Sequence, residues 1–292
     1  MKKFATIMLS CLIAVTVHAD EVDRTIDAAS DGHVDVSNIS GSVTVNGWNR
    51  DAVEVTGTLG RNVKELVLER NGDKILIKVK VPKHSGRGID SHLHINIPQN
   101  SSLDVGTVSA NIEVADIAGE QSLHTVSGDV VTEYTGADTS AESVSGDVEI
   151  SGNNADGEVT ADTVSGDVTL FRVSGEVSAE SVSGNLIVDE GSFSRVELDT
   201  VNGEILFQGE LRDDGRLSIE TINGDVNVEF VGGVSARFEI DTFNGRIRNC
   251  FGPKAERSSR YAPGWELEFT TGDGSGRVEI STLNGAVNIC QE

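Results

Sequence analysis

Two cysteines near the C-terminus carry the most specific chemistry in the sequence. Cys250 and Cys290 each lie five residues after a glycine of a tetrad that recurs along the chain, so they occupy equivalent positions in two repeats. If residues 251–264 loop out, these repeats become neighbours about 4.8 Å apart, within the roughly 4.4–6.8 Å Cα separation of disulfides. We expect a disulfide that fastens the last coil of the fold; a redox or metal-binding pair is the alternative.

Carboxylates form a second candidate group. The residue after the tetrad glycine is acidic in five repeats: Asp129, Asp147, Asp167, Glu204 and Asp225. Stacked in successive coils, these side chains would be structural turn residues, or they would bind calcium, which prefers clustered carboxylate oxygens. The Gly-Gly-x-Gly-x-Asp repeat of calcium-binding β-rolls is absent, so the structural interpretation is favoured and no metal site is predicted.

Histidines offer a weaker metal hypothesis. His92 and His94 flank Leu93 on one expected strand and point to the same face, with His84 nearby. No carboxylate or cysteine at a suitable spacing supports a site there.

Motifs of common catalytic sites are missing. The chain has no Gly-x-Ser-x-Gly elbow, no His-Glu-x-x-His motif and no phosphate-binding loop. Nothing among the 47 acidic residues selects the pair that glycoside hydrolysis needs. Trp48 and Trp265 are the only tryptophans that could stack on a sugar. We expect no catalytic residues and no cofactor.

The charge excludes several partners. The 292 residues include 23 Lys and Arg against 47 Asp and Glu, a net charge of -24. Nucleic-acid binding needs cationic contacts to phosphate, so no nucleic-acid partner is expected, and anionic membranes are disfavoured. Within the expected insertion at 251–264, Lys254, Arg257 and Arg260 form a local basic cluster. We interpret it as a set of counter-ions for neighbouring carboxylates.

The first 19 residues resemble an export signal. Lys2 and Lys3 precede an apolar run over 4–17, which is too short to span a membrane, and Val17-His18-Ala19 offers a cleavage site before Asp20. A lipoprotein anchored at Cys11, or an uncleaved anchor, is the alternative. We expect an exported protein, periplasmic or on the cell surface, without a transmembrane segment in the mature chain. That compartment permits a disulfide.

A tetrad of hydroxyl, apolar, Ser or Asn, and Gly organises the chain. Its glycines are 18 to 21 residues apart, except for a final gap of 40. The copies are Thr125–Gly128, Ser143–Gly146, Thr163–Gly166, Ser181–Gly184, Thr200–Gly203, Thr221–Gly224, Thr242–Gly245 and Thr282–Gly285. Thr107–Ala110 is a degenerate copy, and Asn38–Gly41 is an outlying one.

Apolar residues alternate on both sides of each glycine, as in a half-buried strand. They lie five residues before it and two and four residues after it, for example Leu123, Val130 and Ile150. One coil offers about four inward apolar side chains, or roughly 6–12 kcal/mol, against an ordering cost of about 1–2 kcal/mol for each of some twenty residues. A single coil therefore cannot fold, whereas stacked coils can.

The prediction is an all-β, single-stranded parallel β-solenoid (β-helix), right-handed like most single-chain β-helices. Each position becomes a column of equivalent residues. Apolar columns should fill the interior, tetrad hydroxyls should form a ladder, and Asn202, Asn223, Asn244 and Asn284 should bond through their amides. The corner glycine should supply a positive φ.

The domains expected are a signal peptide at 1–19, an irregular β cap with the first coils at 20–106, and solenoid repeats at 107–292. Within the cap, strands are expected at 52–59, 65–70, 74–81 and 93–97, and Asn71-Gly72 predicts a hairpin. Val63, Leu66 and Val67 could instead form one helical turn.

Three segments resemble a known family. They are Gly41–Asp51 with Gly47-Trp48, the iterated Val-Ser-Gly-Asp-Val units, and Arg248–Pro253 with Leu283–Gly285. The chain is similar over about residues 30–290 to the bacterial putative-adhesin family, a β-strand-repeat domain of unknown function. The resemblance implies an exported β-solenoid of the cell envelope and carries over no catalytic residue. Ala110, Arg246 and Ala286 depart from the repeat pattern.

The sequence therefore predicts a non-enzymatic, adhesin-like envelope or surface protein that presents a rigid acidic face to an unknown envelope component. A polysaccharide-active β-helix enzyme such as a lyase, or a cation-binding structural protein, is the alternative.

Overall fold

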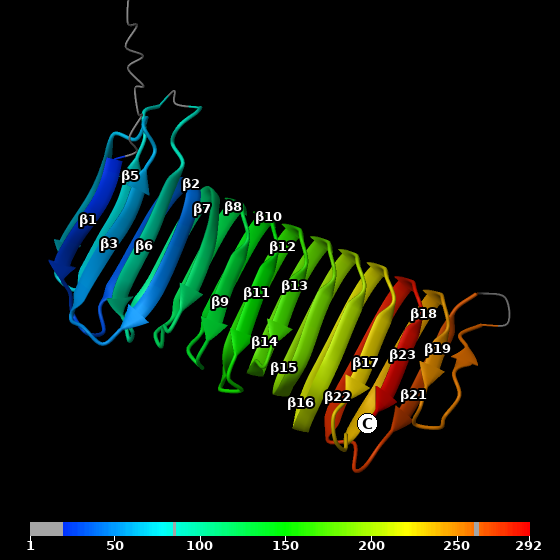
Figure 1. Cartoon of the computed structure of the whole chain (residues 1–292). Coiled ribbons are helices and arrows are strands. Elements are labelled where there is room, and N and C mark those ends of the chain that lie inside the picture. The colour runs from blue at the N-terminus through cyan, green and yellow to red at the C-terminus, as the bar shows by residue number, and fades with distance from the viewer. Residues whose placement is uncertain (1–19, 84–85, 260–262) are drawn as a thin grey trace, which may run out of the picture.

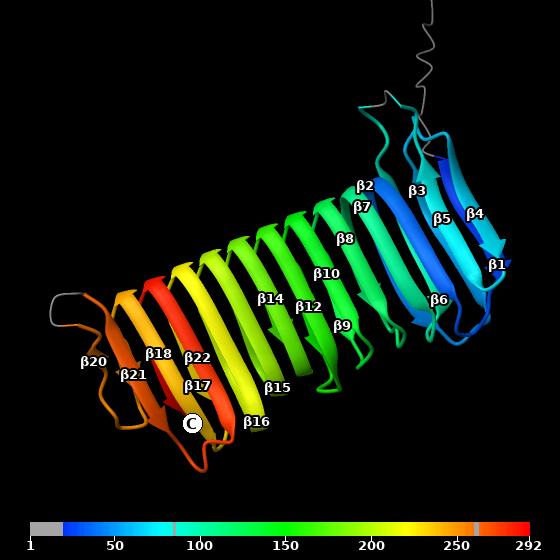
Figure 2. The same ribbon diagram turned by 180° about the vertical axis from the view of Figure 1, so that it is seen from behind.

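The computed structural model of the chain describes residues 20–83, 86–259 and 263–292, which form 23 strands in one continuous, mostly parallel sheet. The expected signal peptide, His84 and Arg260 lie outside these residues. In the central part each coil contributes one strand before the corner glycine and one after it, so the stacked coils form two faces (Figures 1 and 2). The described part of the chain contains no helix that could span a membrane.

The first face holds the strands that precede each corner. They pair in parallel and in register, so that Ala141 lies beside both Leu123 and Ala161. In spatial order its strands are β7 (Ser102–Ala115), β8 (Gln121–Ser127), β10 (Thr139–Ser145), β12 (Asp156–Ser165), β14 (Ser174–Ser183), β15 (Leu186–Asn202), β16 (Ile205–Asn223), β22 (Gly276–Asn284) and β18 (Ala236–Asn244).

The second face holds the strands that follow each corner, to which β7, β15 and β16 also contribute. Val148 lies beside both Val130 and Val168. Its other strands are β9 (Val130–Tyr134), β11 (Val148–Gly152), β13 (Val168–Phe171), β17 (Val226–Phe230), β23 (Val287–Gln291) and β19 (Ile247–Asn249).

The hydrophobic core fills the space between the two faces. The residues five before and two and four after the tetrad glycines are buried, as Leu123, Val130 and Ile150 show, except that Ile247 and Asn249 of the terminal coil are half-buried. Towards the C-terminus the core widens to hold phenylalanines, whose rings contact one another from coil to coil. Phe207 lies between Phe193 and Phe230, with ring centroids 5.5 and 5.9 Å away.

The tetrad's apolar residues form a column, as predicted, but this column does not lie in the interior. Val126, Val144 and Val164 do lie in one column, because the residues on both sides of them pair in register. However, the column faces solvent, and the tetrad's Thr or Ser is buried instead. The reason is the phase of the strand: the residue five before the glycine points inward, so the residues three before it must do so as well.

The expected hydroxyl ladder is also largely wrong. Only Thr107 donates to another tetrad hydroxyl, that of Thr125 at 2.8 Å. In most coils the hydroxyl donates to the corner carbonyl of the preceding coil, as Thr163 does to Gly146 at 3.1 Å. Each of these hydroxyls thereby satisfies a backbone carbonyl that a purely apolar column would leave without that partner. The buried hydroxyl of Thr221 differs, because it has no hydrogen-bond partner among the described residues.

Close approach of the backbones, not a positive φ, explains the corner glycines. The eight tetrad glycines avoid the left-handed region. A Cβ at Gly166 would instead overlap the carbonyl oxygen of Gly146, and the same holds between successive corners. Glycine therefore lets adjacent coils stack at strand spacing, and the expectation of positive φ was wrong.

The last coil in sequence is not the last in space. β22 lies between β16 and β18, and β23 lies between β17 and β19. The coil of β18 and β19 therefore occupies the end, where β21 (Trp265–Thr270) pairs with it in antiparallel fashion and β20 (Glu256–Arg257) pairs with β21. This insertion explains the gap of 40 residues between the last two tetrad glycines.

The other end is built in a similar way. β2 (His33–Trp48) lies beside β7, with Gly41 opposite Ala110, so the outlying and degenerate copies are neighbouring coils. Beyond it lie β5 (Lys74–Lys80) and β6 (Ser91–Pro98), which pair with β2 in parallel. Antiparallel strands then close the end: β4 (Glu65–Asn71) on β5, β3 (Ala52–Leu59) on β6, and β1 (Asp20–Asp27) on β3. The alternative of a helical turn at 63–67 is wrong, because Leu66 and Val67 lie in β4.

Candidate functional site

An exposed column of apolar side chains runs along the first face. We call it the apolar column. It consists of the tetrad's apolar residues in nine successive coils, each between 36% and 47% exposed. In spatial order its members are Val108, Val126, Val144, Val164, Val182, Val201, Ile222, Leu283 and Phe243. Contiguous exposed apolar surface of this kind is typical of interaction sites.

A second column, of acidic side chains, borders the apolar column. We call it the carboxylate column. It lies four residues before each glycine, on the same outward phase of the strands. Its members are Glu142, Asp162, Glu180, Asp199, Glu220 and Asp241, with His124 and Ser281 at the equivalent positions of two other coils. The carboxylate column and seven members of the apolar column, from Val144 to Phe243, line one groove of about 950 Å³, whose floor is the tetrad hydroxyls.

The carboxylate column is electrostatically strained. Burial, followed by the charges of Glu180 and Glu142, raises the pKa of Asp162 to about 6. Burial and then Glu220, Glu197 and Glu180 raise the pKa of Asp199 to about 6. Among the ion pairs of the described residues, the column takes part in one, between His124 and Glu142 at 3.2 Å. Its negative charge is therefore left to solvent or to a partner.

The opposite border of the apolar column is polar but uncharged. It consists of the residue before each glycine, Ser in the first half and Asn in the second. The predicted amide ladder forms here: Asn223 donates to Asn202 at 2.9 Å and accepts from Asn284 at 2.8 Å. The groove is thus acidic on one side only.

The turn acids predicted from the sequence have a structural role. Oδ1 of Asp129 accepts the backbone N–H of Asp147 at 3.1 Å, and Oδ1 of Asp147 accepts that of Asp167 at 2.9 Å. The column continues through Asp167, which accepts the N–H of Asn185 at 2.7 Å. Each of these three carboxylates therefore joins one coil to the next at the corner.

The histidines of β6 do not build a recognisable metal centre. His92 and His94 are exposed on the same face, as expected, and the His92 ring lies 2.9 Å from the Ser42 hydroxyl. The structure describes no group of three or more His, Cys, Asp or Glu side chains that could hold a metal ion.

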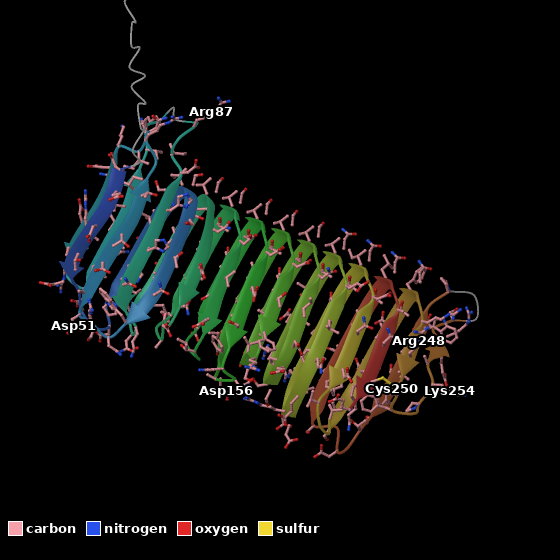
Figure 3. All side chains as sticks on the ribbon, viewed as in Figure 1. Asp51, Arg87, Asp156, Arg248, Cys250 and Lys254 are labelled. Atoms are coloured by element: carbon pink, nitrogen blue, oxygen red, sulfur yellow. A yellow bond between two sulfur atoms is a disulfide. The ribbon has the colours of Figure 1, made fainter. Side chains whose placement is uncertain are left out.

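Two groups of arginines interact locally. The Arg257 guanidinium lies 5.0 Å from the Trp265 ring centre, and Figure 3 shows Lys254 at this same end of the solenoid, near Arg248. On the first face, arginines of four successive coils form a further column, but glutamates lie among them. Arg195 pairs with Glu176 at 3.6 Å, and Arg277 pairs with Glu239 at 3.2 Å. At Arg195 and Arg277 the basic charge of this column is therefore offset by neighbouring glutamates.

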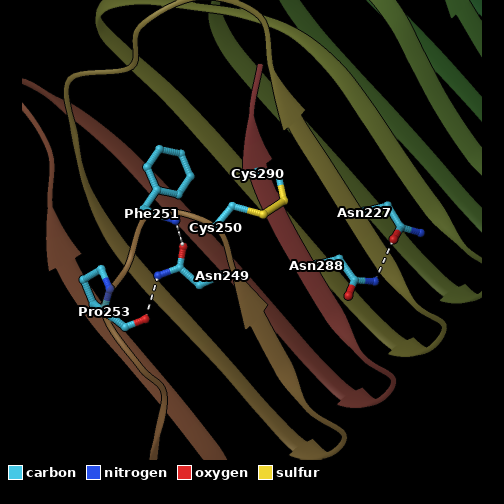
Figure 4. The surroundings of a disulfide bond; sticks show 7 residues. All are labelled: Asn227, Asn249, Cys250, Phe251, Pro253, Asn288 and Cys290. Carbon is cyan, nitrogen blue, oxygen red and sulfur yellow. Dashed lines mark hydrogen bonds between the residues drawn. A yellow bond between two sulfur atoms is a disulfide. The ribbon is translucent and has the colours of Figure 1, made fainter.

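The disulfide prediction is confirmed. Cys250 and Cys290 are bonded, with Cα atoms 4.9 Å apart (Figure 4). The Cys250 N–H donates to the Ile289 carbonyl at 3.1 Å. The bond joins β23 to the end of β19, so it fastens the inserted coil to the terminal one. The expectation that the final coil in sequence would be the exposed end was wrong.

The carboxylate column was not among the sites predicted from the sequence, although the sequence contains its signal. The residue five before each glycine is apolar, so strict alternation places the residues four and two before it outside. The residues two and four after each glycine point inward, whereas the residues two and four before it point outward. The alternation of inward and outward side chains therefore changes phase at the corner.

Comparisons with known proteins place this geometry in a family. The model of the Toastrack DUF4097 family matches residues 32–290. The search of curated proteins gives no match. A putative adhesin from Bacteroides fragilis aligns over 94% of this chain and 97% of its own, at 9% identity and a TM-score of 0.42.

Two proteins of Parabacteroides distasonis are similar at the same level. A putative adhesin aligns over 92% of this chain and 97% of its own, at 13% identity and a TM-score of 0.40. A putative lipid binding protein aligns over 92% and 96%, at 11% identity and a TM-score of 0.35. Likenesses of this size do not determine a function.

Proposed function

Because the chain belongs to the Toastrack DUF4097 family, we propose that it is an exported, non-enzymatic binding protein of the bacterial cell envelope. The family membership confirms the resemblance predicted from the tetrads and the Gly47-Trp48 segment. The proposed precursor carries a signal peptide at 1–19, and the proposed mature chain is a right-handed solenoid with its cap at 20–106 and its repeats at 107–292. Its working surface is the groove between the apolar and carboxylate columns.

One observation supports this function above the others: nine apolar side chains stay in solvent along a straight column, while polar hydroxyls take the buried positions beside them. Exposing this much contiguous apolar surface disfavours solubility. A partner that covers the column would remove that penalty. The rigid, disulfide-fastened scaffold keeps the column straight before binding, which lowers the entropic cost of association.

A photo-crosslinking experiment in intact cells tests this proposal. A benzophenone amino acid would replace Val164 in the apolar column or Val131, which is 39% exposed on the second face. We expect an envelope component to crosslink at position 164 and not at position 131. The mature protein should also begin at Asp20. Equal crosslinking at both positions, or retention in the cytoplasm, would contradict the proposal.

A further inference from the structure

The direction of the groove restricts what can occupy it. The apolar column crosses the strands of the first face, because its members come from successive coils. The backbone N–H and C=O groups of those strands are already bonded to neighbouring coils. A partner segment lying across them finds no ladder to extend, so it must satisfy its own backbone hydrogen bonds. An α-helix does so, whereas an added β-strand would not.

The dimensions of the column fit a helix. Nine coils at about 4.8 Å spacing give a column about 38 Å long, which matches a helix of about 26 residues. The helical pitch of about 5.4 Å exceeds the coil spacing by only about 0.6 Å, so apolar residues of about three successive turns can seat near the gaps between neighbouring valines before the register drifts. Six of the nine members of the column are valines, and the larger Ile222, Leu283 and Phe243 lie together at one end, so most of the column leaves room for the side chains of a partner.

The carboxylates beside the apolar column favour a partner with positive charge. One border carries Glu142, Asp162, Glu180, Asp199 and Glu220, and the other carries serines and asparagines. A helix with lysines or arginines along one flank would pair with the carboxylates and relieve the repulsion between them. A second copy of this chain carries a net charge of -24 as well, so the two copies would repel each other.

Resting on the function proposed above, we infer that the groove receives a cationic amphipathic α-helix of a partner protein. Its apolar face lies on the apolar column and its basic flank lies on the carboxylate column. The partner is therefore recognised by a pattern, apolar residues at helical spacing beside a row of positive charges, and not by β-strand addition.

Titration with designed peptides tests the inference. The probe is a peptide of about 26 residues with leucines on one face, lysines on one flank and alanines elsewhere. One control peptide carries glutamates in place of the lysines, and another has the same composition in scrambled order. Calorimetry measures affinity and stoichiometry, and circular dichroism measures helix gained on binding.

Paired variants separate the groove from the rest of the acidic surface. Val164→Thr with Val182→Thr reduces the apolar column, and Val131→Thr with Val231→Thr removes similar exposed groups elsewhere. Asp162→Asn with Glu180→Gln reduces the carboxylate column, and Glu113→Gln with Glu149→Gln removes two exposed acids of the second face. All four pairs are at least partly exposed, and thermal melting checks that each variant folds.

We expect one lysine peptide to bind per chain and to become helical. The Val164/Val182 pair should weaken binding about tenfold, and the Asp162/Glu180 pair should weaken it and flatten its salt dependence. Control pairs should stay within about twofold. Equal binding of the glutamate or scrambled peptide, or equal losses in test and control pairs, would overturn the inference.

The remaining outcome concerns self-association. If the protein sediments as a dimer that the Val164/Val182 pair makes monomeric, a second copy occupies the groove and the inference fails. The crosslinking experiment is independent of these results: a crosslink at position 164 without peptide binding would keep the proposed function and reject the helix.

Discussion

The side-chain amide of Asn284 donates a hydrogen bond to the amide oxygen of Asn223 at 2.8 Å, although 61 residues separate them in sequence. Asn244 in turn donates to Asn284 at 2.9 Å. The order Asn223, Asn284, Asn244 shows directly that the last coil in sequence lies between two earlier coils, those of Asn223 and Asn244. Its strands are consequently paired on both sides, and the sequence end is not the frayed end of the solenoid.

Removing the disulfide should destabilise this inserted arrangement. The Cys250–Cys290 bond closes a loop with a sequence separation of 40 residues, for which chain entropy gives about 3–4 kcal/mol. Cys250→Ser with Cys290→Ser should lose that much unfolding free energy in urea titrations. Reductant should lower the wild-type protein to a similar value and leave the variant unchanged. A variant as stable as the oxidised protein would contradict the prediction.

A methyl group at a corner should separate two coils. Gly166→Ala places a Cβ against the Gly146 carbonyl oxygen, and overpacking of this kind costs about 1–3 kcal/mol or more. Gly106→Ala is the matched control, since a Cβ there meets no atom within 4 Å and restricts the unfolded chain. Chemical denaturation should show a loss for Gly166→Ala and no loss for Gly106→Ala. Equal stabilities would show that the corner backbones can move apart freely.

The hydroxyl of Tyr134 is buried without a hydrogen-bond partner in the described structure. Burial, followed by the charges of Asp138 and Asp156, raises the pKa of this phenol to about 12. Tyr134→Phe removes the unsatisfied oxygen and keeps the ring, so the unfolding free energy should rise by up to about 1 kcal/mol. Urea titration checks this. A clear loss of stability would show that the hydroxyl has a partner, such as an ordered water.

Mild acid should stabilise the protein. The pKa values of Asp162 and Asp199 are raised from 3.8 to about 6 in the folded state, so folding favours their protonated forms. Their destabilising effect is complete above about pH 6 and disappears as the pH falls from about 6 to about 4. Because both groups are half exposed and screened, the expected gain between about pH 7.5 and pH 5 is on the order of 1–2 kcal/mol in total.

Variants assign that pH dependence to the carboxylate column. Asp162→Asn with Asp199→Asn should raise stability at neutral pH and reduce its rise on acidification. Glu149→Gln, on the second face, should leave the slope unchanged. Thermal melts over this pH range measure both effects. A slope that persists in the double variant would place the responsible carboxylates elsewhere.

Repetition let the sequence determine most of the fold. Tetrads at a regular spacing, such as Thr163–Gly166, place equivalent residues in register because no single coil can bury enough apolar surface to fold alone. Column equivalence located the amide ladder and the Cys250–Cys290 pair. Outside the repeats, local alternation located the strands at 52–59 and 65–70, and the turn preference of Asn71-Gly72 located the hairpin.

Only the tertiary structure decided the order of the coils and which of two possible phases the tetrad adopts, since the residues five and two before each glycine are both apolar. Every coil carries nearly the same tetrad, so any coil could pair with any other in the same register. The sequence therefore does not predict that Thr282–Gly285 stacks between Thr221–Gly224 and Thr242–Gly245. The corner shifts the alternation by one residue, and a shift of one residue exchanges inside and outside. That exchange put Val164 in solvent and Thr163 in the core, and it created the groove beside Asp162.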